Sequence, residues 1–259
     1  MKKKHLIPFL LVFIGLLTLS FAPADSIKLR LKPQQGKTYN ITSKATMMTT
    51  MKVQGQSMSM SQSLETRQSF TAKEVFNNKS VLETQIDAIK MSISQMGMKL
   101  EYDSEHPEKA SPMLAGQTRE FEKHINKPAT ITFDEMGKLI GDSLELSQLS
   151  NVIVELPEQD LTEGSKWDFT KTQTVNNVDL NVNMEYTVIA ITKKSVDVSF
   201  TGTVDSKEVT GSYNGTASFN PQTGMVMNSS TKSNISMTVN EEGLSIPITV
   251  TGTTTIEMK

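Results

Sequence analysis

The stretch YNITSKATMMTTMKVQGQSMSM, residues 39–60, contains the pattern that decides the fold of this chain. From Tyr39 to Val53 the odd-numbered residues are largely apolar and the even-numbered residues are largely polar. A period of two residues is typical of a strand with one buried and one exposed face, and it fits no helix. Gly55 is free to adopt a positive φ, which favours a hairpin turn. The alternation then resumes up to Met60.

The same alternation recurs along most of the chain, in residues 58–70, 81–102, 178–188, 196–200 and 244–258. A change of phase near Ala88 predicts a β-bulge, and Asn77 and Asn78 predict a turn. Strands with one polar and one apolar face belong to antiparallel sheets joined by hairpins. At about 3.3 Å per residue the longer runs exceed about 35 Å, which favours a strongly curved sheet or a barrel. An outer-membrane barrel is less favoured, because Ser, Thr and Gln interrupt the apolar face and aromatic residues are few. We therefore predict an all-β fold of long curved antiparallel sheets, half-barrel or sandwich-like.

Residues 1–24 have the features of a secretory signal peptide. Lysines at positions 2–4 precede an apolar run over residues 6–19, and Ala22-Pro23-Ala24 supplies the small residues that signal peptidase prefers. The apolar run is shorter than the ~20 residues of a membrane-spanning helix. We expect cleavage before Asp25, no transmembrane segment afterwards, and secretion across the inner membrane to the periplasm or the extracellular space.

The composition excludes several classes of protein. The chain has no cysteine, so neither disulfides nor a cysteine for lipid anchoring are available. Its 26 Lys and Arg and 28 Asp and Glu are dispersed, and the formal net charge is −2. This balance gives no reason to expect nucleic acid or anionic lipid headgroups as partners.

The middle of the chain departs from the alternation. Residues 104–152 carry loop signals, including two close prolines, and a segment that begins at Asp142 fits a short helix. The acidic segment 157–164 is rich in turn residues. We predict a first β half over residues 25–156, which contains the loop and helix insert, and a second β half over residues 157–259.

An internal repeat supports two related halves. Residues 36–42, GKTYNIT, match residues 164–170, GSKWDFT. Residues 132–139, TFDEMGKL, match residues 218–225, SFNPQTGM, and both read as strand, Asx turn, glycine and strand. Matches this short also arise by chance, but two related halves are the interpretation that we favour. The glycines would then serve turns, and the aromatic residue of each opening motif would pack in the core.

These and similar segments resemble those of an uncharacterised family of secreted β-rich proteins from Gram-negative bacteria, which is classed as a domain of unknown function. The segments that carry the resemblance are the Gly-x-x-aromatic opening, Tyr102-Asp103-Ser104, Pro112…Leu114…Gly116, Phe133-Asp134…Gly137, Leu156-Pro157 before Gly164…Trp167, and Phe219-Asn220…Gly224. The resemblance spans nearly all of the chain after the signal peptide and implies a fold but no catalytic residues. More loosely, a long curved sheet is similar to half-barrel periplasmic lipoprotein carriers, which hold acyl chains on a concave face.

Methionine supplies the candidate binding residues. Six methionines fall in pairs on single predicted strand faces. Met58 and Met60, and likewise Met96 and Met98, are two residues apart, which places their side chains about 7 Å from each other. Met47 and Met51, four residues apart, also share one face. Thioethers are soft ligands suited to Cu(I), but no His or Cys accompanies these residues. They stand in phase with leucine and aromatic residues, where methionine fills irregular apolar space.

Groups for catalysis are sparse. The chain after residue 24 keeps His106 and His124, too few for a zinc site or a nucleophile with its base. Carboxylate pairs suffice for glycoside hydrolysis, and three pairs are candidates by proximity alone: Glu101 with Asp103, Asp134 with Glu135, and Glu241 with Glu242. We expect no enzymatic activity, no metal and no cofactor.

We therefore predict a secreted, non-catalytic β protein that binds a lipid or another apolar ligand on a methionine-rich concave face. The alternative is a structural or surface module that contacts an envelope protein and binds no small ligand. Copper binding through methionine and hydrolysis through carboxylates are less favoured alternatives.

Overall fold

The computed structural model describes residues 26–53, 55–141, 153–175, 178–241 and 244–259. The predicted signal peptide and the predicted helix at residues 142–152 lie outside this part of the chain. The described residues confirm an all-β fold of long antiparallel strands. The strands are β1 (Thr38–Val53), β2 (Gln56–Phe76), β3 (Lys79–Gln95), β4 (Met98–Asp103), β5 (Ala129–Asp134), β6 (Leu139–Ile140), β7 (Lys166–Val175), β8 (Val178–Ile191), β9 (Val196–Asp205), β10 (Val209–Phe219), β11 (Val226–Glu241) and β12 (Leu244–Met258).

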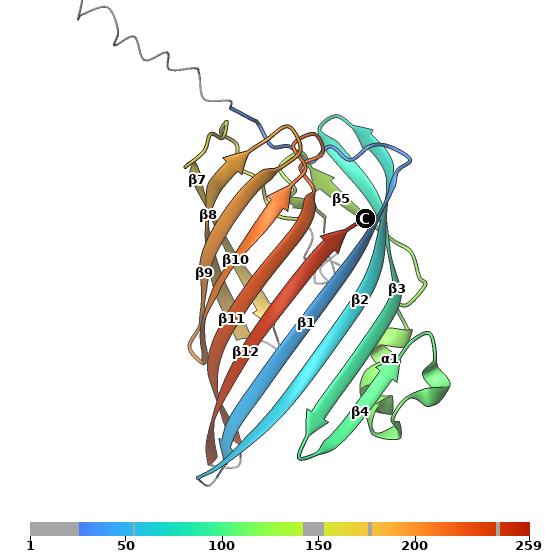
Figure 1. The fold of residues 1–259 in the computed structure, drawn as a ribbon, viewed down its shortest axis with the longest axis vertical. Coiled ribbons are helices and arrows are strands. Elements are labelled where there is room, and N and C mark those ends of the chain that lie inside the picture. The colour runs from blue at the N-terminus through green and yellow to red at the C-terminus, as the bar shows by residue number, and fades with distance from the viewer. Residues whose placement is uncertain (1–25, 54, 142–152, 176–177, 242–243) are drawn as a thin grey trace, which may run out of the picture.

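The twelve strands form a single sheet in the order β6-β5-β3-β2-β1-β12-β11-β10-β9-β8-β7, with β4 paired to β3. The pairing of β1 with β12 joins the two halves of the chain. The sheet curves strongly, and its terminal strands β6 and β7 do not pair with each other, so it stays open (Figure 1). The two halves therefore share one sheet, which corrects the prediction of a separate sheet in each half.

The predicted turns and bulge are present. Gly55 between β1 and β2 has a φ of 82°, and Asn77 and Asn78 between β2 and β3 have φ angles of 45° and 59°. The β2–β3 register shifts after Arg67, which pairs with Ala88, so the phase change predicted near Ala88 is confirmed as a β-bulge.

The matched segments occupy equivalent places in the two halves. β1 and β7 each follow a glycine with a positive φ, 80° at Gly36 and 82° at Gly164. β5 and β10 each lead into an Asx turn, in which the side-chain oxygen of Asp134 or Asn220 accepts hydrogen bonds from backbone N–H groups further along the chain. The repeat seen in the sequence thus marks equivalent structural elements.

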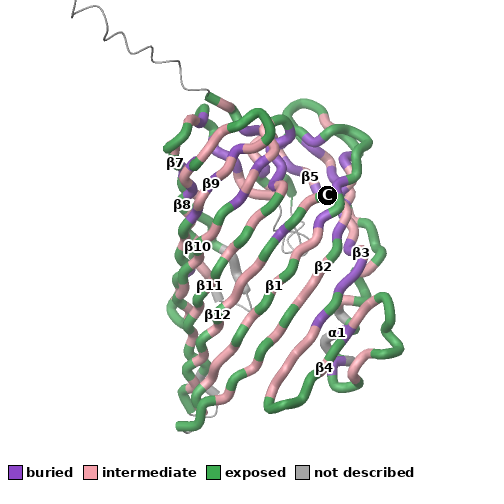
Figure 2. Tube along the Cα trace, viewed as in Figure 1, coloured by how far each residue is buried: buried purple, intermediate pink, exposed green. Residues whose placement is uncertain are grey.

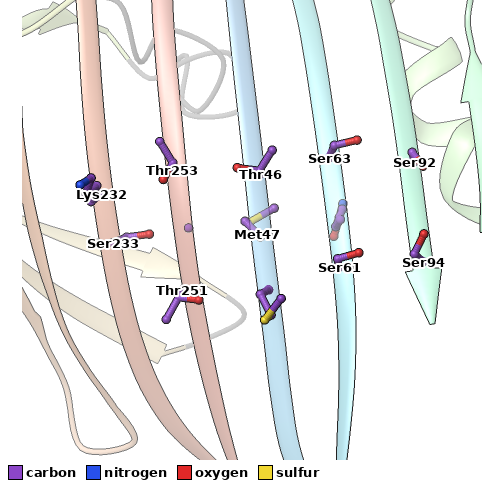
Figure 3. A pocket seen from close by; sticks show the side chains of 13 residues that line it. Thr46, Met47, Ser61, Ser63, Ser92, Ser94, Lys232, Ser233, Thr251 and Thr253 are labelled. Carbon is purple, nitrogen blue, oxygen red and sulfur yellow. The ribbon is translucent and has the colours of Figure 1, made fainter. Parts of the chain in front are cut away.

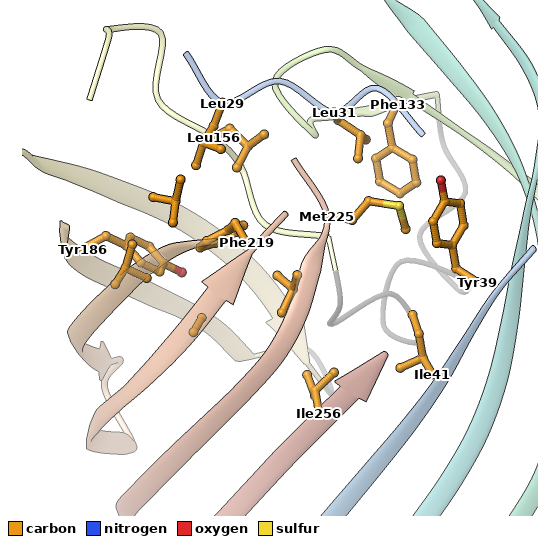
Figure 4. Packing of buried hydrophobic residues seen from close by; sticks show 14 of the residues in the cluster. Leu29, Leu31, Tyr39, Ile41, Phe133, Leu156, Tyr186, Phe219, Met225 and Ile256 are labelled. Carbon is orange, nitrogen blue, oxygen red and sulfur yellow. The ribbon is translucent and has the colours of Figure 1, made fainter. Parts of the chain in front are cut away.

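The core fills one end of the curved sheet, the upper end in Figure 2. Segment 26–37 crosses this end and hydrogen-bonds to three turns, through Ile27 to Leu161, Leu31 to Glu135 and Lys32 to Thr223. Residues from both halves meet beneath the segment (Figure 4), and the most deeply buried include Leu29, Leu31, Phe70, Leu82, Ile131, Leu161, Val196, Val198, Phe219 and Met225.

Gly224 marks the closest approach of this N-terminal segment to the sheet. Its φ is +66°, and a Cβ there would lie 2.3 Å from the backbone oxygen of Arg30. We expect Gly224→Ala to lower the free energy of unfolding by more than about 2 kcal/mol, because both the strained φ and the backbone clash oppose it. Gly36→Ala is the matched control, since Gly36 has a φ of +80° and open space around its Cβ position.

The control should cost only about 1 kcal/mol, the penalty of the left-handed conformation. Urea unfolding followed by circular dichroism measures both variants. Equal decreases in the free energy of unfolding for Gly224→Ala and Gly36→Ala would mean that the N-terminal segment does not pack tightly on the turn at Gly224.

A second, smaller core lies under the insert of the first half. η1 (Pro107–Lys109), η2 (Pro112–Leu114) and α1 (Ala115–Glu122) follow β4. Leu114 packs in a cluster with Ile86, Ile89, Met91 and Tyr102. The sequence analysis predicted a loop and helix insert over residues 104–152, and α1 lies in the part of it that carries loop signals. Its eight residues are too few for a stable isolated helix, and tertiary packing supports it.

Four charged residues form an ion-pair network beside this insert. Arg67 pairs with Glu105, and Lys90 Nζ lies 3.0 Å from an Asp103 carboxylate oxygen and 3.4 Å from a Glu105 carboxylate oxygen. The pKa of Glu105 is lowered chiefly by its hydrogen bond with Arg67. The pKa of Asp103 is lowered first by the backbone N–H of Glu105 and then by Lys90.

Carboxyl groups with lowered pKa values stabilise the fold above their unfolded pKa values, and this contribution disappears as the pH falls through the folded values. We expect Glu105→Gln to lower the urea midpoint slightly at pH 7, because the network is exposed to solvent. The difference from the unmodified protein should shrink as the pH falls below the ordinary pKa of a glutamate and through the lowered folded pKa of Glu105. A difference that stays the same from pH 7 to pH 3 would show that the loss is not electrostatic.

Candidate functional site

The alternation of the strands separates two chemically different faces. The face that carries the core is concave and largely apolar, while the convex face carries mostly Ser, Thr, Asn and charged residues. The cross-strand ion pair of Lys44 with Glu65, 3.2 Å between Nζ and Oε2, is on the convex face. The concave face is therefore suited to apolar ligands, whereas the convex face is polar and in contact with solvent.

Below the core, the concave face contains a cavity of about 440 Å³. This volume lies within the range of small-molecule sites. The apolar part of the lining comprises Phe133, Leu139, Ile153, Val154, Phe169, Val182, Met184, Phe200, Ala217, Val226 and Ile256. The polar part comprises Glu155, Lys171, Tyr186, Tyr213, Ser229, Thr231, Ser233 and Thr254.

Glycines on the concave face keep this cavity open. A Cβ at Gly202 would lie 2.1 Å from Met184 Sδ, and a Cβ at Gly215 would lie 2.5 Å from Phe200 Cζ. The side chains of Met184 and Phe200 therefore lie over the glycines, on the wall of the cavity. Glycine inside a strand commonly marks such close approaches.

The apolar face continues from the cavity to the lower end of the sheet. In the register, Ile235 lies opposite Val250, and Ile248 lies between Met237 and Met51. These side chains are half-buried, because the curved sheet screens them from the sides. Among the described residues, β1, β11 and β12 make close contacts mainly with their neighbours in the sheet. We call this face, from the cavity to the lower ends of β8 to β12, β1 and β2, the trough.

Four of the predicted binding residues lie in the trough. Met47, Met51, Met58 and Met60 are half-buried, and Met51 and Met58 are direct cross-strand partners. They line the trough below the cavity, and the methionine that lines the cavity is Met184. These four methionines therefore share one face of the sheet, as the strand alternation predicted, and their binding of a ligand stays a prediction.

Met96 and Met98 correct the sequence prediction. Met96 and Gly97 form the turn between β3 and β4, with φ angles of 50° and 80°, and Met98 begins β4. The side chains of Met96 and Met98 are 71% and 54% exposed, so they belong to a hairpin tip and share no strand face. The continuous alternation around Met-Gly concealed this turn, since Asn-Gly and Asp-Gly are the usual hairpin signals.

A second pocket of about 550 Å³ crosses β3, β2, β1, β12 and β11 (Figure 3). Serine and threonine dominate its lining, including Ser61, Ser63, Ser92, Thr251 and Thr253. By strand alternation these side chains belong to the convex face, opposite to the trough. The pocket therefore combines hydroxyl groups with the thioether side chains of Met47 and Met48, which also line it.

The candidate catalytic groups have structural roles. Asp134 Oδ1 accepts backbone hydrogen bonds of 2.9 and 2.8 Å in its turn. Glu101 pairs with Lys99, 2.6 Å between Oε1 and Nζ, and Asp103 pairs with Lys90. Across the described ranges, no three His, Cys, Asp or Glu side chains gather as a metal site. Glu242 of the third carboxylate pair lies outside those ranges.

The two histidines stand apart. His106 lies at the start of η1, where its Nδ1 is 3.6 Å from a Glu108 carboxylate oxygen, and both side chains are exposed. His124 lies after α1 on the exposed surface, far along the chain from His106. Neither histidine lines the cavity.

The polar residues of the cavity are the ones that the sequence analysis missed. Ser229, Thr231 and Ser233 lie in phase with the apolar residues of β11, and Lys171 lies in phase with Trp167 and Phe169 of β7. Burial raises the pKa of Tyr186 to about 12, so this phenol is neutral at ordinary pH. Burial also raises the pKa of Tyr213. The sequence signal that could have revealed this site is a polar residue at a strand position whose side chain faces the concave, apolar side.

No protein-family model matches the chain, and no curated protein sequence matches it. A solved structure concerned with lipid–protein interactions in lipovitellin matches with a TM-score of 0.51 and 12% identity, over 87% of this chain and 25% of lipovitellin. The fold is similar to that of lipovitellin. This chain spans about a quarter of the lipovitellin chain.

Two bacterial structures match less well. An outer-membrane channel from Pseudomonas putida F1 has a TM-score of 0.27 at 6% identity, over 88% of this chain and 97% of the channel. The translocator domain of the autotransporter NalP from Neisseria meningitidis has a TM-score of 0.23 at 9% identity, over 86% of this chain and 90% of that domain. Within the described residues, no helix has the length and apolar character needed to cross a membrane. The resemblance to a family of secreted β-rich proteins stays a prediction.

Proposed function

We propose that this protein binds a lipid-sized apolar or amphipathic molecule in the trough and does not transform it chemically. The observation that carries this proposal is the continuity of the cavity of about 440 Å³ with an apolar concave face that none of the described strands covers. Large exposed apolar surfaces on soluble proteins mark interaction sites. The ligand would provide the apolar cover that the sheet itself lacks.

The length of the trough fits an acyl chain. Along β12, Thr254 at the cavity and Leu244 at the lower end are ten residues apart, which corresponds to about 33 Å at ~3.3 Å per residue. The acyl chains of one bilayer leaflet span only about 15 Å, half of the ~30 Å hydrocarbon core. The trough therefore has room for a whole amphiphile with its chain extended along the strands.

The energetics favour long chains over short ones. Burying roughly ten methylenes at about 0.8 kcal/mol each contributes about 8 kcal/mol to the free energy of binding. This contribution is similar in size to the free-energy cost of association, ~4–15 kcal/mol, which it must offset. Shorter chains do not offset that cost, whereas longer chains reach useful affinity. We therefore expect affinity to rise with chain length.

The lipovitellin structure concerns lipid–protein interactions, and its likeness to this chain is a likeness of fold. The predicted secretion would place a lipid binder outside the cytoplasm. Copper binding by Met51 and Met58 is less favoured, because these residues stand among other apolar side chains of the trough.

Titration with the methyl ester of cis-parinaric acid, a neutral fluorescent polyene, tests the proposal. We expect saturable binding with one probe per chain and displacement by long-chain lipids. The alternative, a protein-contacting module without a small ligand, predicts that the probe fluorescence shows no saturable change. That result would overturn the proposed function.

A further inference from the structure

Among the described residues that line the cavity, one side chain is cationic: Lys171 on the edge strand β7, which is exposed to solvent at the cavity wall. Trp167 and Phe169 face the core and the cavity, so strand alternation turns Lys171 to the same side. The Thr170 hydroxyl donates a hydrogen bond to Oδ1 of its cross-strand neighbour Asn183 on the opposite side of the sheet, with 3.1 Å between the two oxygens. Lys171 thus faces the trough, where its neighbour across the sheet is Val182.

Lys171 makes no ion pair with any described residue. Other lysines of the sheet do: Lys166 of the same strand lies 2.9 Å from Glu185 on the convex face. Glu155 also lines the cavity, but no ion pair joins it to Lys171. A lysine whose stem lies beside apolar residues and whose ammonium is unpaired is suited to an anionic group of a bound molecule.

The wall opposite β7 also offers unused hydrogen-bonding groups. Ser229, Thr231, Ser233 and Thr254 line the cavity from β11 and β12. None of these four hydroxyls hydrogen-bonds to a side chain or backbone atom of the described residues. These hydroxyls are half-buried and within reach of water in the free protein, and a polar part of a ligand can take the place of that water. A pure hydrocarbon would leave them unpaired.

We infer that the ligand is an amphiphile with a single anionic head, a carboxylate or a phosphate, held by Lys171 at the cavity while its acyl chain lies along the trough. This inference rests on the proposed function and specifies its ligand class. The overall charge of −2 gave no sign of such a head, because one inward lysine contributes little to the total. An inward charge on an edge strand also discourages strand-to-strand aggregation, and the test separates the two roles.

The test compares cis-parinaric acid with its methyl ester, which share one acyl chain and differ in head charge. We expect the purified protein to bind the acid about tenfold more tightly than the ester, as a charge-assisted hydrogen bond would give. Lys171→Gln should remove this preference and leave ester binding unchanged. Lys232→Gln removes an exposed lysine of the convex face and should keep the preference. Glu155→Gln should strengthen acid binding alone.

The outcomes separate the two proposals. Equal binding of acid and ester by the unmodified protein would overturn the anionic head and leave the apolar site standing, whereas failure of both probes would overturn the proposed function as well. If Lys171→Gln bound neither the acid nor the ester, the inference would also be contradicted, because the result would show that Lys171 supports the packing of the site. Competition by palmitate against competition by lysophosphatidic acid distinguishes a carboxylate head from a phosphate head.

Discussion

Replacing Trp167 with alanine is expected to lower the free energy of unfolding by about 3–5 kcal/mol, the usual loss for a buried aromatic residue. Trp167 is 8% exposed. Its ring stacks on Tyr186 with centroids 4.8 Å apart and an interplanar angle of 9°, and Tyr186 contacts Phe200 with centroids 5.6 Å apart. The substitution removes the outer ring of this aromatic row and leaves a cavity at the start of β7.

Trp167→Phe is the matched control. It keeps a ring against Tyr186, and Trp167 Nε1 has no hydrogen-bond partner in the described structure, so no bond is lost. We expect this variant to lose less than about 1.5 kcal/mol. Urea unfolding followed by circular dichroism measures both, since Trp167 is the single tryptophan of the chain. A loss near zero for the alanine variant would show that the opening strand of the second half is not held by this ring.

The second prediction is that Thr231→Trp will weaken binding of the neutral probe by at least about tenfold. Thr231 lies on β11 in the cavity, opposite Gly215 of β10 and Thr254 of β12. An indole buries about 150–250 Å² and would occupy the space that the ligand needs. The Thr231 hydroxyl makes no hydrogen bond to the described residues, so its replacement removes none and the fold should persist.

Ser230→Trp is the control for this variant. Ser230 is the preceding residue of β11, is exposed and faces the convex side, so the same indole there should leave probe affinity unchanged. Ser233→Trp provides a second inward substitution in case Thr231→Trp does not fold. If both inward variants bind the probe as well as the control does, the ligand site is not the cavity.

Alternation of residues was sufficient to predict the strands and their faces, because the buried and exposed sides of a half-buried strand differ at every step. The concave positions of Met47, Met51, Met58 and Met60 follow directly from this period. The turns at Asn77 and Gly164 and the Asx turns of Asp134 and Asn220 were also predictable, since their chemistry is local.

The features that escaped prediction depend on contacts between distant residues. The pairing of β1 with β12 cannot be read from either strand, because both present the same pattern to any neighbour. Helix α1 depends on packing by Leu114 and Phe121 against the insert's core, and its own residues give a weak signal. Lys171 gave no signal in the sequence analysis, since its place at the wall of the cavity is visible only once the sheet is curved.

The central claim is that the trough holds a lipid-sized amphiphile, and native mass spectrometry of the protein purified without detergent from the cells that make it tests this most directly. We predict that part of the protein carries one adduct with the mass of an acyl-chain lipid, and that the adduct is absent from Thr231→Trp and present in Ser230→Trp. The bare polypeptide mass in every preparation, including protein incubated with long-chain lipids, would contradict the claim.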